Sequence, residues 1–240
     1  CNLKDRKSTR LTGVQTCALP IFQVANAIGT VALCIILFSG GLDTKISEIR
    51  PILPQGIILA TSGVLLTALV TGVVIWWVLG MTMASAGISL LTSLLLASTM
   101  ASTDSASVFS ILRAKNLHLK NNLRPMLELE SGSNDPMAYA LTIVFLTLVL
   151  NPDKGIGSVI PFFIKQMAIG AAGGAVFAVA SKYIINHIKL AYEGLYPVLV
   201  ISLMFLTFSL TDFAGGNGFL AIYLCALYLG NQDLIHKRTI

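Results

Sequence analysis

The sequence contains few charged residues and no pattern that would crosslink the chain or hold a structural metal. Only 11% of its 240 residues are charged, about half the share that a soluble domain carries, which excludes an ordinary soluble fold. Cys34 and Cys225, two of the four cysteines, lie inside apolar runs. This placement excludes a disulfide framework, and no cysteine or histidine spacing typical of a metal centre is present. We therefore expect no resident cofactor.

Two further classes are excluded by patterns that are missing. Apolar and polar residues do not alternate over segments of roughly ten residues, so the chain is not a transmembrane β-barrel. The formal net charge is +5, but the basic residues lie at the ends of apolar runs. Membrane topology explains that placement, so we expect no nucleic-acid partner.

In place of charge, the sequence has long apolar segments. Most of them reach the roughly 20 residues that a helix needs to cross a bilayer. The small residues of Gly170-Ala-Ala-Gly-Gly174 predict a close helix contact. We predict an all-α polytopic membrane protein, surrounded by membrane lipid, with about seven transmembrane helices at about 24–42, 53–79, 87–112, 126–150, 159–185, 195–210 and 217–230.

The basic residues between these segments indicate the orientation of the chain. Ten of them share one side of the predicted membrane, and only Lys154 and Lys165 lie on the other. Cytoplasmic loops carry an excess of Lys and Arg. We therefore predict that the basic stretches 45–50, 113–124, 182–189 and 237–238 are cytoplasmic.

The first 21 residues differ from the rest of the chain. They carry four basic residues, no apolar core of a signal peptide and no periodicity. Asp5-Arg-Lys-Ser-Thr-Arg-Leu11 is what GAT CGG AAG AGC ACA CGT CT encodes, and Thr12-Gly-Val-Gln-Thr-Cys-Ala-Leu-Pro-Ile21 is what ACT GGA GTT CAG ACG TGT GCT CTT CCG ATC encodes. Both look like a translated sequencing adapter. We expect residues 1–21 to be non-native and residues 22–240 to be a partial transmembrane domain, truncated at both ends.

Two aspartates lie at the predicted middle of the membrane. Asp104 precedes the basic end of its segment, Arg113, by nine residues, and Asp135 follows the basic start of its segment, Arg124, by eleven. At 1.5 Å per residue these depths are roughly 14 Å and 16 Å, close to half of a ~30 Å hydrocarbon core. Ionisable residues at such depth are functional candidates by default.

The residues around the two aspartates suit a monovalent cation. Ser131 and Asp135 are four residues apart and share a helix face, as do Glu130 and Asn134. Hard cations prefer such oxygen ligands. Asp104 is either an ion ligand or a structural charge. The hydroxyls around it belong to Ser98, Thr99, Ser102, Thr103, Ser105 and Ser107.

Four strings of the sequence resemble the NhaP-type branch of the monovalent cation:proton antiporters, and most of all its bacterial potassium/proton antiporters. The resemblance covers about 22–240 and keeps the order of the motifs. It identifies the chain as roughly the N-terminal half of such a protein. The strings are Ser39-Gly-Gly-Leu42, Ser102-Thr-Asp-Ser-Ala-Ser-Val-Phe-Ser110, Leu129-Glu-Ser-Gly-Ser-Asn-Asp-Pro-Met137 and Gly218-Phe-Leu-Ala-Ile-Tyr-Leu224.

The resemblance implies a thirteen-helix bundle of two inverted repeats, a homodimer in the bacterial cytoplasmic membrane. Its helix at 87–112 would be broken near 103–104 and would cross a second unwound helix. Many family members carry an acidic residue where this chain has Ser39, and this difference argues against a charged ligand from the first helix.

The resemblance also implies roles for individual residues. Asp135, with Asn134 beside it, would bind cation and proton in competition. Ser131 and the Thr103 backbone would help to coordinate the transported Na⁺ or K⁺, and Glu130 would pair with an arginine on a later helix.

We therefore predict exchange of Na⁺ or K⁺ for H⁺ by alternating access, and no enzymatic activity. Two alternatives remain open at this point. A symporter or channel of a related fold would use the same residues. An intramembrane aspartyl protease would use Asp104 and Asp135 as a pair that shares one proton.

Overall fold

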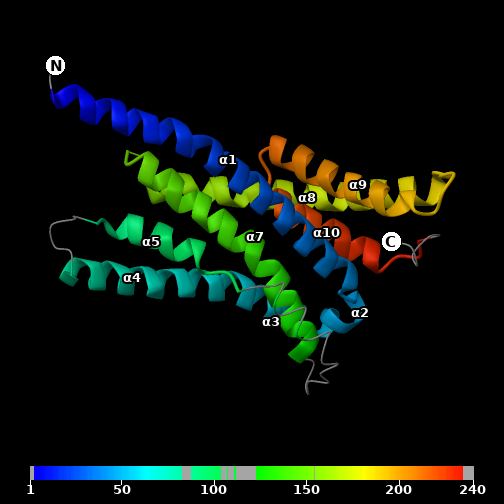
Figure 1. The fold of residues 1–240 in the computed structure, drawn as a ribbon. Helices are drawn as coiled ribbons and strands as arrows, with labels where there is room; N and C mark the ends of the chain where they lie inside the picture. Colours follow the sequence, from blue (N-terminus) through cyan, green and yellow to red (C-terminus); the bar gives the residue numbers. More distant parts are fainter. Residues whose placement is uncertain are drawn as a thin grey trace.

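The computed structural model describes residues 3–82, 88–103, 107, 111, 123–153 and 155–234, with most of their side chains from residue 21 onward. Every regular element in these ranges is helical, as predicted (Figure 1). The elements are α1 (Leu3–Asp43), α2 (Ile46–Ile49), a 3₁₀ turn (Arg50–Ile52), α3 (Leu53–Ile58), a π-helical turn (Leu59–Gly63), α4 (Val64–Thr82), α5 (Leu90–Thr99), α7 (Leu123–Leu150), α8 (Ile156–His187), α9 (Leu195–Phe213) and α10 (Gly218–Gly230).

The predicted apolar segments all contain helices. Within the described ranges, five stretches are long and apolar enough to cross a membrane: Ile21–Asp43, Ile46–Met81, Leu123–Leu150, Gly157–His187 and Leu195–Phe213. Leu90–Thr99 and Gly218–Gly230 are shorter apolar helices. The prediction of an all-α polytopic membrane protein is confirmed.

One boundary differs from the prediction, and one helix is interrupted close to where the prediction placed a break. The helical path of the second segment begins at Ile46 and not near residue 53, because α2 and the 3₁₀ turn precede α3 and run through Pro51. Arg50 lies in this path ahead of the apolar run. Proline is tolerated in the first turn of a helix, where its missing N–H has no partner to lose. In the third segment α5 ends at Thr99 and residues 101–103 are not helical, whereas Ser107 and Ile111 are helical again. This agrees with the break near 103–104 that the resemblance implies.

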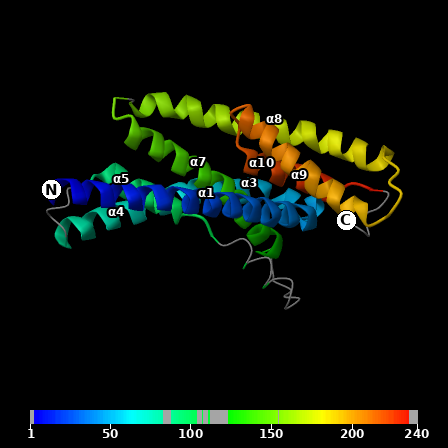
Figure 2. The ribbon, with the colours of Figure 1, turned by 45° about the horizontal axis from the view of Figure 1, so that its top comes forward.

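The helices form two groups that meet along α7. Helices α1, α8, α9 and α10 pack together around a core that includes Leu37, Met204 and Ile222. Helices α4 and α5 pack against each other, and α7 contacts both α5 and α8. Figures 1 and 2 show α7 between the α4–α5 pair and the helices α8 and α10. Residues on α7 can therefore reach both groups.

Helix α10 approaches its neighbours closely at glycines. A side-chain carbon built on Gly174 of α8 would lie 2.8 Å from the Ala221 carbonyl oxygen, and one on Gly41 of α1 would lie 2.8 Å from Ala226 Cβ. Small residues let membrane helices approach to backbone contact. Gly41 therefore serves packing and does not end α1, which continues to Asp43.

The outer face of α4 is apolar and exposed. It includes Val70, Val74, Trp77 and Met81, which are 57%, 51%, 61% and 68% exposed. A contiguous surface of this kind is unfavourable in water. It suits contact with lipid, as the membrane assignment requires.

Candidate ion-binding site

The candidate site begins where α5 ends. Ser89 caps the start of this helix, since its hydroxyl oxygen accepts from the Thr92 N–H at 3.2 Å. At the other end, the Met100 N–H donates to the Ala97 carbonyl at 3.1 Å, and the chain then leaves the helix. Ala101 is buried against Ala68 and Ala138. This contact fixes the non-helical residues 101–103 against the middle of α7.

Helix α7 presents polar side chains to this break. Ser131 and Asn134 are fully buried, and Asp135 is half-buried. Asp135 follows the first residue of α7, Leu123, by twelve positions, which is roughly 18 Å along the helix. Its carboxylate therefore lies within the span and far from either end.

The side chains of the break and of α7 contact one another directly. The Ser102 hydroxyl donates a short hydrogen bond to Asp135 Oδ1, and it lies 3.2 Å from its second acceptor, Asn134 Oδ1. Thr103 Oγ1 lies 3.4 Å from Ser131 Oγ and accepts from Asn134 Nδ2. One carboxylate, three hydroxyls and one amide thus converge from two chain segments.

Glu130 lies at the edge of this cluster. Its Oε1 accepts from Asn134 Nδ2 at 3.1 Å, which joins it to the network about one helical turn before Asn134. The resemblance predicted a pairing of Glu130 with an arginine on a later helix, and this prediction stays untested.

The structure brings together Thr103, Ser131, Asn134 and Asp135, all of which the sequence predicted, with Glu130 beside them. Their role as ligands stays a prediction. Asp104 lies outside the described residues. The sequence pattern indicated Ser102 only as one of several hydroxyls near Asp104. In the structure, Ser102 is the residue whose hydroxyl contacts Asp135. Its signal was its place next to Thr103, since successive side chains of a non-helical segment can reach the same neighbour.

The opposite side of α7 packs on α10. A side-chain carbon on Gly132 would lie 2.5 Å from Tyr223 Cε2. Tyr139 meets Phe219 edge to face, with ring centroids 5.0 Å apart. The carbonyl of Pro136 accepts from Asn217 Nδ2 at 2.9 Å. Gly132, Pro136 and Tyr139 follow the i, i+4, i+7 spacing of one helix face. Helix α7 therefore has a polar face toward the α5 break and a packing face toward α10.

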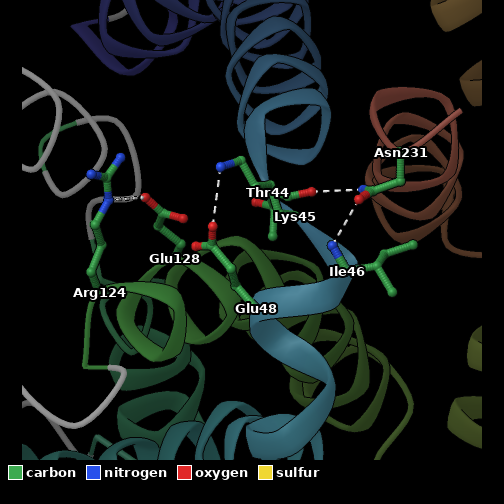
Figure 3. A network of polar contacts seen from close by, with 7 residues as sticks. All are labelled: Thr44, Lys45, Ile46, Glu48, Arg124, Glu128 and Asn231. Carbon is green, nitrogen blue, oxygen red and sulfur yellow. Dashed lines mark hydrogen bonds and ion pairs between the residues drawn. The ribbon is translucent and has the colours of Figure 1, made fainter. Parts of the chain in front are cut away.

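A second polar network lies at the end of the bundle that we predict to be cytoplasmic (Figure 3). Asn231, just after α10, donates to the Thr44 carbonyl and accepts from the Ile46 N–H, both at 2.8 Å. It thereby holds the corner between α1 and α2.

Two ion pairs lie near this corner, Lys45–Glu48 at 3.1 Å and Arg124–Glu128 at 3.0 Å (Figure 3). The first pair is exposed, and pairs of that kind contribute only about 0–1 kcal/mol, whereas the Glu128 side chain of the second pair is 12% exposed. They mark the polar end of the bundle and are separate from the contacts of Asp135.

The donor set of the candidate site is rich in neutral oxygen. Among the described residues, no group of three or more His, Cys, Asp or Glu side chains is arranged to hold a metal ion. One carboxylate with hydroxyl and amide oxygens suits a hard, weakly charged cation better than a transition metal, which prefers imidazole or thiolate. The arrangement fits transient binding of an alkali ion or a proton.

Comparison with known proteins gives a consistent result. A family model described as "sodium/hydrogen exchanger, transmembrane" matches residues 15–239. The K⁺/H⁺ antiporter NhaP of Alkalimonas amylolytica is 36% identical over 212 residues, which are 88% of this chain and 36% of that protein.

Two further relatives show the range of similarity. The K⁺/H⁺ antiporter NhaP2 of a Shewanella species is 36% identical over 221 residues, 91% of this chain and 37% of that protein. The Na⁺/H⁺ antiporter NhaS2 of a Synechocystis species is 25% identical over 210 residues, 86% of this chain and 36% of that protein. The chain spans little more than a third of the length of these relatives.

Proposed function

The chain belongs to the sodium/hydrogen exchanger family of transmembrane proteins, and from this premise we propose that it forms part of a secondary active transporter that exchanges K⁺ or Na⁺ for H⁺. This is a family of transporters and not of enzymes, so the intramembrane protease alternative is set aside. Because the chain spans about 36% of the length of the relatives it matches, the exchange activity is proposed for a longer protein that contains it.

One observation carries the proposal. The Asp135 carboxylate meets the hydroxyl of Ser102 at the break after α5, and Thr103, Ser131 and Asn134 complete the same cluster. Transporters place ion sites at interrupted helices, where side-chain and backbone oxygens line a cavity near the midplane. The cluster has the chemistry and the location that such a site requires.

The proposed mechanism is competition for one carboxylate. An ionised Asp135 inside the span is unfavourable, and either a proton or an alkali cation neutralises it. A proton and a cation cannot occupy the carboxylate at the same time. If the transporter switches between its inward-open and outward-open states only when the carboxylate is neutralised, it must exchange the cation for the proton. Alternating access of one part of the bundle against another then moves the loaded site between the two sides.

We propose K⁺ as the principal cation. The relatives at 36% identity are named as K⁺/H⁺ antiporters, and the relative named as an Na⁺/H⁺ antiporter is 25% identical. Serine and threonine hydroxyls with one carboxylate accept either ion. The assay below is therefore run with both.

The experiment measures proton flux in proteoliposomes that contain the full-length exchanger. We expect a K⁺ gradient to drive H⁺ movement in the opposite direction, and Asp135→Asn to abolish it, because an amide can neither bind a proton at neutral pH nor neutralise a cation. Asp212→Asn is the matched control, since Asp212 is exposed at the end of α9, and we expect it to retain exchange.

Three outcomes would contradict the proposal. If the Asp135→Asn variant still exchanges K⁺ for H⁺, this carboxylate is not the group that binds the two ions. Proton flux in the same direction as the cation indicates a symporter, and cation flux without proton movement indicates a channel.

Further features of the whole protein belong to the same proposal. We place it in a bacterial cytoplasmic membrane as a homodimer, with the basic stretches 45–50, 113–124, 182–189 and 237–238 on the cytoplasmic side. Lys45 and Arg50 are exposed at one end of the bundle, as this orientation requires.

The origin of residues 1–21 is also a proposal. We assign them to a translated adapter because their amino-acid sequence is what the adapter DNA encodes, although helix α1 begins at Leu3 and the family model matches from residue 15. Amplification of the genomic locus with a primer upstream of codon 22 tests this. Recovery of the same 21 codons would overturn it.

A further inference from the structure

The turn between α9 and α10 leads from exposed residues, Asp212 to Gly215, to the buried residues Gly216 and Asn217. Helix α9 ends at Phe213, and Gly215 turns the chain with a φ of 79°, a conformation that favours glycine. The turn is held by the Gly216 N–H, which donates to the Thr211 carbonyl at 3.0 Å. Helix α10 has 13 residues, or roughly 20 Å, too short for the ~30 Å hydrocarbon core. It therefore begins deep within the structure, at Asn217, which is 0% exposed.

Asn217 joins three helices at this point. Its Nδ2 donates to the Pro136 carbonyl of α7 at 2.9 Å, and its Oδ1 accepts from the Leu220 N–H at 3.0 Å, which caps α10. Its backbone N–H donates to the Gln166 carbonyl of α8 at 2.9 Å.

The position of Asn217 is fixed from the side of α8. A side-chain carbon on Gly170 would lie 2.8 Å from the Asn217 carbonyl oxygen and 3.1 Å from its nitrogen. The turn is therefore in backbone contact with α8 and cannot move closer. The Asn217 side chain is thus buried, and both its amide nitrogen and its amide oxygen are hydrogen-bonded. Its backbone is held in place by the contact with α8.

The carbonyl that Asn217 holds belongs to the residue after Asp135. Pro136 has no N–H, so α7 lacks one helical hydrogen bond at this position and its direction is less constrained. The Asn217 side chain, from the start of α10, donates a hydrogen bond to α7 at the same residue where this helical hydrogen bond is missing. The direction of α7 at Pro136 sets where the Asp135 carboxylate lies relative to Ser102 and Thr103.

We infer that Asn217 is a positioning residue for ion binding, which holds Asp135 in register with the α5 break through the Pro136 carbonyl. The inference rests on the proposed function. It predicts that loss of the Nδ2–H donor weakens the binding of the cation, whereas a purely structural role would lower the amount of folded protein and leave the KM unchanged.

Three substitutions separate the two functions of the side chain. N217A removes both the donor and the cap, and N217S keeps a cap oxygen but not the donor to Pro136. N217D keeps the shape and the cap, and it regains a donor only when its carboxyl group is protonated. The ionisable side chains nearest in sequence to these contacts, which are Asp135, Tyr139, Lys165 and Asp212, are the same in every variant.

The experiment measures K⁺-driven proton exchange by the full-length protein in proteoliposomes at several pH values, with thermal unfolding of each variant in detergent. We expect N217A and N217S to raise the KM for K⁺ about tenfold, the effect of one lost buried hydrogen bond, with a kcat within about twofold of the original. N217D should match them at alkaline pH. Its KM relative to the unmodified protein should recover at acidic pH, whereas that of N217S should not.

Asn231→Ala is the matched control. Asn231 makes long-range hydrogen bonds at the opposite end of α10, roughly 20 Å from Asn217 along the helix. We expect this control to lower the melting temperature and to leave the KM unchanged.

The outcomes distinguish this inference from the proposed function. If the unmodified protein exchanges K⁺ for H⁺ and N217A has an unchanged KM with only a lower melting temperature, Asn217 is structural and the inference fails. A raised KM in the Asn231 control as well would also overturn it, because the effect would then not be local. If the unmodified protein shows no exchange, the proposed function itself fails.

Discussion

Replacement of Gly132 by alanine tests the contact that joins the site helix α7 to α10. The added Cβ would lie 2.5 Å from Tyr223 Cε2, 2.9 Å from Cζ and 3.0 Å from the hydroxyl oxygen. Tyr223 is only 2% exposed, so its ring has no open space to enter. Overpacking of a buried contact costs about 1–3 kcal/mol, and alanine returns about 1 kcal/mol through its higher helix propensity. The net loss is about 1 kcal/mol.

For a chain of this size, a loss of that magnitude lowers the melting temperature by roughly 2–4 °C. The assay is thermal unfolding in detergent micelles. Gly80→Ala in α4 is the control, since a Cβ there meets nothing within 4 Å, and we expect it to raise the melting temperature. The difference in melting temperature between the two alanine variants reports the cost of overpacking against Tyr223, because both variants gain the same helix propensity.

A second background tests whether Tyr223 is the cause. Leucine lacks the ring atoms and the hydroxyl that the added Cβ would meet, so Gly132→Ala should no longer destabilise a Tyr223→Leu protein. Equal stability of the Gly132 and Gly80 variants would refute the reasoning. So would the same loss in the Tyr223→Leu background.

Two further predictions concern packing and orientation. Ser98 Oγ and Thr142 Oγ1 lie 3.1 Å apart, and Ser98 is 0% exposed; a double-mutant cycle of Ser98→Ala and Thr142→Val should give a coupling free energy of about 0.5–1.5 kcal/mol in urea unfolding, and additive losses would contradict the contact. For orientation, a cysteine placed at Asp153, which is exposed between α7 and α8, should react with an impermeant maleimide in intact cells. A cysteine at Lys45 should react only after lysis, and the reverse pattern would overturn the predicted topology.

The helices were predictable because membrane spans follow from composition alone. A run of apolar residues long enough to cross the bilayer has few alternatives to a helix, since lipid offers no partner for backbone groups. Helix starts were harder to predict where the first turns are polar. Helix α7 begins at Leu123, and its residues up to Asp135 include four charged side chains that a count of apolar residues does not see.

The candidate site was predictable in part, for a geometric reason. Two aspartates at similar depth on adjacent antiparallel segments indicated a shared site, and in the structure Ser102 meets Asp135 and Thr103 meets Asn134. The supporting contacts were not predictable. Asn217 meets Pro136 across 81 positions of sequence, and Asn231 meets Thr44 across 187. An asparagine beside glycines in sequence indicates only a turn or a cap. Whether it also reaches another helix depends on the packing of the whole bundle.

The string Ser131-Gly-Ser-Asn-Asp-Pro136 combines two sets of residues with different tasks. Ser131, Asn134 and Asp135 face the α5 break, and Gly132 and Pro136 face α10. A carboxylate that alternates between a proton and a cation needs its oxygen neighbours held to within about 0.5 Å. Contacts on one face of a helix constrain the other face only when they lie within the same turn. Because the two faces alternate along one turn of α7, the polar residues that we propose as ligands and the small residues that pack on α10 must be contiguous in sequence.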